Sequence, residues 1–104
     1  MLAESSSAQS EEATVIASFN SQLASLAATW KSRNSGAVVT IVDTQAPFNT
    51  ALSNPTAYGA GSGGATCYNS DGVSCLWWNN YHPGQAIQKL VAAAVASALS
   101  GSFF

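Results

Sequence analysis

The sequence predicts an α/β fold in the order helix, strand, loop, helix. Apolar side chains recur at three- and four-residue steps over residues 10–33 and again over 84–99, which is the period of an amphipathic helix. Between them, residues 37–42 form a mostly β-branched apolar run, typical of a strand buried on both faces of a parallel sheet. Because a lone strand has nothing to pair with, the chain is expected to be the last third of a larger α/β domain.

The first expected helix follows a Ser/Ala-rich segment, residues 1–10, which lacks periodicity and is expected to be disordered. Acidic residues near the start of this helix and basic residues near its end complement the helix dipole. Its predicted apolar face consists of Val15, Ile16, Phe19, Leu23, Leu26, Ala27 and Trp30.

Asp43 follows the predicted strand at its carboxyl end, where active and binding sites of open α/β sheets are located. Residues 44–66 form a long connection rich in Gly and Pro, with one helical turn expected over residues 48–52. The final helix is expected over residues 84–99.

Cys67 and Cys75 flank the turn signal of residues 69–72. A turn there would bring the two cysteines together, and a disulfide would then stabilise the fold by about 2.5 kcal/mol. This pairing indicates an oxidising compartment. Two free thiols in a cytosolic protein are the alternative, whereas the spacing does not suit zinc.

Composition excludes several classes of protein. With 104 residues, 47% hydrophobic and 8% charged, the chain is too apolar to be disordered and large enough for one small domain. Three basic residues and a net charge of −2 argue against nucleic-acid binding. No apolar run reaches the roughly 18 residues of a membrane span. Residues 1–10 do not resemble a signal peptide, so we expect the leader of a secreted protein to lie outside this chain.

His82 is the single histidine, and it lies between an aromatic loop and the final helix. A histidine can act as general base near neutral pH when a partner orients its other ring nitrogen. Taken alone, a histidine here is more commonly a helix-capping or loop residue. The surrounding residues 76–84 resemble the last conserved block of SGNH/GDSL hydrolases, in which an aromatic residue precedes Asp-x-x-His-Pro and a helix.

The order of other motifs is similar to that family as well. Residues 54–59 read Asn-Pro-x-x-Tyr-Gly and precede the cysteine pair, as in fungal-type secreted acyl and acetyl esterases like those of carbohydrate esterase family 16. Residues 19–34 look like the family helix that leads into the final strand. The resemblance covers about residues 14–100.

The resemblance implies a three-layer α/β/α (flavodoxin-like) fold on a five-stranded parallel sheet, with residues 11–104 as its C-terminal part. It implies hydrolysis of carboxylic esters, such as acetyl groups on carbohydrate or lipid-like esters, without a cofactor or metal. The family's nucleophile lies in a Gly-Asp-Ser block and an oxyanion donor in a Gly-x-Asn-Asp block, and this sequence contains neither. The isolated chain is therefore expected to be inactive.

The resemblance assigns catalytic roles to His82 and Asn79, with one departure: the family has an aspartate where this chain has Asn79. Three explanations stay open: a Ser-His pair suffices, another carboxylate (Asp43 or Asp71) substitutes, or activity is lost. An asparagine can also hold the wrong imidazole tautomer, which costs about 10⁴ in rate in a serine protease.

The aromatic residues of the loop are candidates for a substrate wall, with one tryptophan expected in the core: Trp77, Trp78 and Tyr81. Two other interpretations compete with the esterase. One is a small non-catalytic secreted module that binds its ligand through these rings, and the other is a chain with no independent fold.

Overall fold

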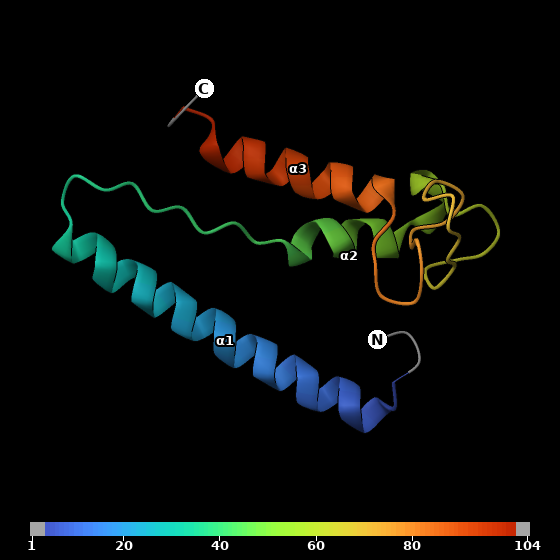
Figure 1. The fold of residues 1–104 in the computed structure, drawn as a ribbon, viewed down its shortest axis with the longest axis horizontal. Helices are drawn as coiled ribbons and strands as arrows, with labels where there is room; N and C mark the ends of the chain where they lie inside the picture. Colours follow the sequence, from blue (N-terminus) through green and yellow to red (C-terminus); the bar gives the residue numbers. More distant parts are fainter. Residues whose placement is uncertain (1–3, 102–104) are drawn as a thin grey trace. The chain divides into compact units, whose positions relative to one another are not determined.

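The computed structural model describes residues 4–101, which contain three α-helices and a short 3₁₀ helix (Figure 1). These residues divide into two units, residues 4–41 and residues 42–101, and each is described by itself. The helices are α1 (Ser6–Arg33), α2 (Gln45–Ser53), η1 (Pro55–Tyr58) and α3 (Gln85–Leu99).

Helix α1 begins four residues before its predicted start. The Ser5 side chain accepts a hydrogen bond from the Ala8 amide at 3.3 Å, which satisfies one of the free N–H groups of the first turn. At the other end, the Asn34 side chain donates to the Trp30 carbonyl at 2.8 Å. Residues 6–10 thus form the first turns of α1, while residues 1–3 of the segment predicted to be disordered lie outside the described residues.

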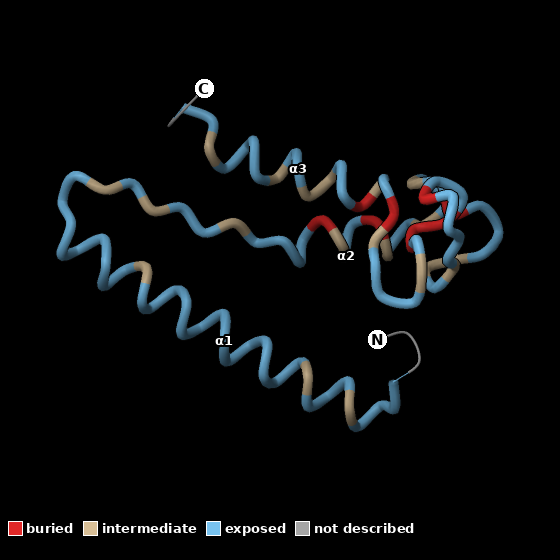
Figure 2. Tube along the Cα trace, in the orientation of Figure 1, coloured by how far each residue is buried: buried red, intermediate tan, exposed pale blue. Residues whose placement is uncertain are grey.

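The predicted apolar face of α1 is exposed to solvent. No residue of this helix is buried, and Figure 2 shows α1 in the exposed and intermediate colours throughout. Periodicity therefore identified the helix, but not a packing partner for its face. The large apolar side chains exposed along α1 are Val15, Ile16, Phe19, Leu23, Leu26 and Trp30.

The α/β prediction is wrong for this chain. Residues 37–42 lie outside any helix or strand, no strand occurs anywhere in residues 4–101, and Val38 and Ile41 are more than half exposed. A β-branched run becomes a strand only when a neighbouring backbone pairs with it. None does here, so the expected parallel sheet and the three-layer architecture built on it are not observed.

The core lies in residues 42–101, where α2 packs against α3 (Figures 1 and 2). Leu76 and Ile87 are fully buried. The centroids of the Trp77 and Phe48 rings are 6.0 Å apart, and their planes are tilted by 45°. Helix α2 is longer than the single predicted turn, and α3 matches its prediction to within one residue. The core residues are Ala51, Ala60, Leu76, Trp77 and Ile87.

Short loop segments pair side by side next to this core without forming a sheet. Two isolated bridges join Trp77 to Tyr68 and to Pro83. The Asn69 amide donates to the Trp77 carbonyl at 2.9 Å, and the Trp78 amide donates to the His82 carbonyl at 2.9 Å. These bonds bring the disulfide loop, the aromatic segment and the residues before α3 together.

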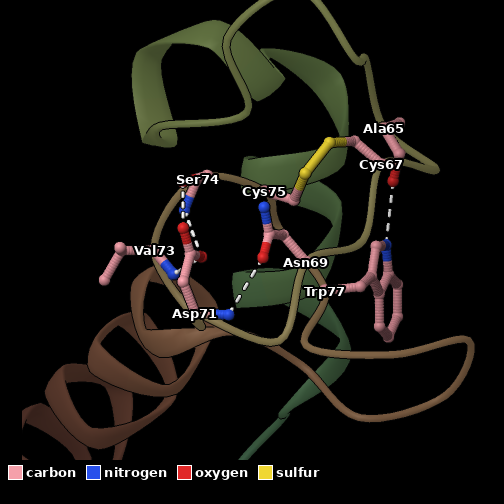
Figure 3. The surroundings of a disulfide bond; sticks show 8 residues. All are labelled: Ala65, Cys67, Asn69, Asp71, Val73, Ser74, Cys75 and Trp77. Carbon is pink, nitrogen blue, oxygen red and sulfur yellow. Dashed lines mark hydrogen bonds between the residues drawn. A yellow bond between two sulfur atoms is a disulfide. The ribbon is translucent and has the colours of Figure 1, made fainter.

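The predicted disulfide is confirmed. Cys67 and Cys75 are bonded, with their Cα atoms 5.2 Å apart (Figure 3). The bond closes the loop that contains the turn of residues 69–72, in which Gly72 adopts a φ of 73°. A left-handed φ of this kind is costly for residues with a Cβ, so glycine suits this position.

Gly84 lies where three backbone carbonyls converge. A Cβ at this buried residue would lie 3.0 Å from each of the carbonyl oxygens of Gly72, Cys75 and Leu76. The Gly84 amide donates to the Leu76 carbonyl at 2.7 Å, and the next amide, that of Gln85, donates to the Gly72 carbonyl at 2.9 Å. The disulfide loop thus satisfies the first N–H of α3.

Gly84→Ala should destabilise residues 42–101, because the added methyl meets backbone atoms that cannot rotate away. We expect a loss of about 1–3 kcal/mol in the free energy of unfolding, measured by chemical denaturation. Gly36→Ala is the matched control, since a Cβ there meets nothing within 4 Å. Equal stability of the two variants would contradict this account of the convergence at Gly84.

Candidate functional site

His82 lies in the loop of residues 78–83, which leaves the core after Trp77 and returns just before α3. Its backbone is anchored, because its carbonyl accepts the Trp78 N–H at 2.9 Å. Its side chain is exposed. The fold thus fixes the main chain of this residue while leaving the imidazole accessible to a reactant.

A single atom of Asn79, its side-chain oxygen Oδ1, contacts both the imidazole of His82 and the backbone before it. This oxygen accepts the backbone N–H groups of Tyr81 at 3.1 Å and His82 at 2.8 Å. The same oxygen lies 3.0 Å from Nδ1 of the His82 ring. The structure therefore brings together the two residues predicted to be catalytic, and it does so through a turn closed by the Asn79 side chain.

Two aromatic rings border the imidazole. The centroids of the Tyr81 and His82 rings are 4.2 Å apart, and their planes are tilted by 40°. The centroids of the Trp78 and His82 rings are 5.9 Å apart, in an edge-on arrangement. The Trp78 indole is fixed by donating Nε1–H to the Ser70 carbonyl at 2.7 Å. Tyr81 is 54% exposed and Trp78 is 46% exposed, so both side chains can contact a bound molecule.

Trp77 has a different environment. It is 8% exposed, belongs to the core, and donates its Nε1–H to the Ala65 carbonyl at 2.8 Å (Figure 3). Of the three aromatic residues predicted as a substrate wall, the structure brings Trp78 and Tyr81 to His82. It places Trp77 beneath the loop.

The two acidic residues considered as substitutes for the missing aspartate are both engaged locally. Asp43 accepts the Gln45 amide at 2.9 Å and so satisfies the first N–H of α2. Asp71 accepts the amides of Val73 and Ser74, each at 2.9 Å, and the Ser74 hydroxyl (Figure 3). Within residues 4–101, no hydrogen bond joins either carboxylate to His82.

These hydrogen bonds perturb the Asp71 carboxyl group. The Ser74 hydroxyl contributes most, followed by the amides of Ser74 and Val73, and together they hold the pKa of Asp71 below its ordinary value of 3.8. The charged form is therefore favoured in the folded loop.

No group of three or more His, Cys, Asp or Glu side chains in residues 4–101 could hold a metal ion. None of the helices described is long and apolar enough to cross a membrane.

The sequence analysis considered how Asn79 would act on the imidazole, but it missed that the Asn79 side chain also closes the turn before His82. An asparagine two residues before an amide often closes a turn by accepting that N–H, and this signal is present at Asn79 and Tyr81. The Trp78–Ser70 contact had no such signal, because it joins two loops that pair only in the folded chain.

Comparison with known proteins indicates a relation to an esterase. One similar protein is named acetylesterase, from Thermothelomyces thermophilus, and is 55% identical over 96 residues. The match takes in 92% of this chain and 31% of the relative, so the chain spans about a third of that protein's length. No protein-family model matches the sequence, and no solved structure matches it significantly.

Asp71→Asn should change how stability depends on acid. Because the pKa of Asp71 is lower in the folded chain, its charged form stabilises the loop at pH values above its ordinary pKa of 3.8. This stabilisation is lost as the pH falls through the lowered pKa of Asp71 in the folded chain. The difference in unfolding free energy between wild type and variant should therefore be constant above about pH 5 and shrink in acid. A difference that does not depend on pH would contradict the assignment.

Proposed function

We propose that this chain carries the histidine end of a carboxylic ester hydrolase, with His82 as its general base. One observation carries the proposal: Asn79 engages Nδ1 of the imidazole, while Nε2 has no hydrogen-bond partner in residues 4–101. A base with one nitrogen oriented and the other available is what a nucleophile–histidine pair requires.

In this mechanism, Nε2 of His82 removes the proton from a serine hydroxyl as its oxygen attacks the ester carbonyl. The same nitrogen then returns the proton to the departing alcohol, which leaves an acyl group on the serine. A water molecule, activated in the same way, releases the acid. No serine of this sequence is assigned as nucleophile, and no oxyanion block is present, so the proposed mechanism requires both groups to be supplied from outside these 104 residues.

The finer assignment is an SGNH/GDSL hydrolase similar to carbohydrate esterase family 16. The Asn-Pro-x-x-Tyr-Gly motif, the cysteine pair and the His-Pro block support it, as does the relative named acetylesterase. The substrate would be a small acyl or acetyl ester on a carbohydrate or a lipid-like alcohol. The disulfide supports secretion, because such bonds persist in oxidising compartments.

The binding-module interpretation is not favoured. The two exposed rings of the aromatic loop, Trp78 and Tyr81, both contact the imidazole. They therefore belong to the same site as His82, and the similarity to an acetylesterase points to ester chemistry for that site.

The isolated chain should hydrolyse p-nitrophenyl acetate no faster than its His82→Ala variant. Stabilisation of the oxyanion is usually the largest electrostatic contribution to acyl transfer, and the sequence contains neither the nucleophile block nor the oxyanion block. Release of p-nitrophenolate measures the rate. Robust turnover that disappears in His82→Ala would show that this chain has a complete site of its own.

A chimera tests the role of His82 directly. This chain would replace the matching 31% of the Thermothelomyces thermophilus acetylesterase, which supplies the rest of the polypeptide. His82→Ala in the chimera should lower kcat/KM for an acetyl ester by roughly 10²–10⁴, the range for a general base.

Asn80→Ala is the control for this experiment, because Asn80 lies in the same loop and its side chain makes no hydrogen bond within residues 4–101. An active chimera that tolerates His82→Ala as well as Asn80→Ala would refute the proposed base. Circular dichroism of each variant separates a loss of fold from a loss of chemistry.

A further inference from the structure

The orientation of the Asn79 amide is decided by its backbone partners. A side-chain amide carries an oxygen, which only accepts hydrogen bonds, and a nitrogen, whose two N–H groups only donate them. The N–H groups of Tyr81 and His82 both point at the same terminal atom of Asn79, at 3.1 and 2.8 Å. Only an oxygen can accept both, because a flipped amide would set its own N–H groups against two donors.

This orientation in turn decides the imidazole tautomer. The oxygen that accepts the two amides lies 3.0 Å from Nδ1 of His82. A carbonyl oxygen cannot donate, so the contact is favourable only when Nδ1 carries the hydrogen. In the neutral ring, the lone pair that can accept a proton then lies on Nε2.

We infer that Asn79 is a positioning residue that holds neutral His82 in the Nδ1–H tautomer, so that Nε2 is the basic nitrogen. In a serine protease whose triad aspartate is replaced by asparagine, the wrong tautomer costs about 10⁴ in rate. Here the two backbone N–H groups prevent that outcome. The catalytic meaning of the tautomer rests on the proposed function, but the tautomer itself does not.

Within residues 42–101, no carboxylate shares this task. Asp43 and Asp71 are held by the start of α2 and by the Val73–Ser74 amides. The other groups that contact the imidazole are the uncharged rings of Trp78 and Tyr81. Within residues 4–101, Asn79 is therefore the group that orients the ring by hydrogen bonding.

The test is long-range ¹H–¹⁵N NMR of the full chain, labelled with ¹⁵N, above the pH at which the ring is protonated. This spectrum distinguishes a protonated ring nitrogen from a bare one. The wild type should show mainly protonated Nδ1 and bare Nε2, the reverse of the preference of a free imidazole side chain. A dominant Nε2–H form in the wild type would overturn the inference.

Two variants separate orientation from folding. Asn79→Asp keeps an oxygen for the two amides and the ring, and should keep the tautomer. Asn79→Ser can still accept a backbone amide but is too short to reach Nδ1 as well, so the tautomer ratio should fall roughly fivefold or more, as expected for one hydrogen bond.

Asn80→Ala should leave the ratio unchanged. A wild-type ratio in Asn79→Ser would overturn the inference even if the proposed function holds. Conversely, the expected ratios combined with a chimera that tolerates His82→Ala would reject the function and leave the positioning role intact. The two ideas therefore fail on different measurements.

Discussion

The arrangement of residues 42–101 depends on the close approach of backbones at Gly84. Three carbonyls converge on this residue, and its N–H and that of Gln85 satisfy two of them. This contact ties the disulfide loop to the first turn of α3. Because the loop of residues 78–83 leaves from Trp77 and must return to Gly84, the same contact limits where His82 can lie.

Local chemistry explains which features could be predicted. Helices α1 and α3 follow from apolar periodicity, and the disulfide follows from a strong turn signal between two cysteines. The sequence also indicated that one of the two neighbouring tryptophans, Trp77 and Trp78, would lie in the core. All of these depend on residues close together in sequence. The proximity of Asn79 and His82 is equally local, since they lie three positions apart in the sequence.

Features that depend on distant partners could not be predicted. The β-branched run of residues 37–42 has the composition of a strand, but pairing is a property of two segments, and no second segment pairs with it in residues 4–101. The apolar stripe of α1 shows the same limit, since an amphipathic pattern predicts a helix but not the surface that covers it. Likewise, nothing near Trp78 in sequence indicates its bond to the Ser70 carbonyl.

The site also separates two tasks that a triad aspartate performs together. One is to orient the imidazole, and the Asn79 oxygen can do this because backbone amides fix its direction. The other is to stabilise the positive charge that the imidazole gains when it accepts a proton, which a neutral amide does poorly. The tilted Tyr81 ring, with its centroid 4.2 Å away, lies within the range of a cation–π interaction. Such an interaction is worth about 0.5–1 kcal/mol at exposed sites, less than a charge-assisted hydrogen bond provides. Under the proposed function, His82 is therefore a base that is well oriented but whose imidazolium is weakly stabilised by its own loop.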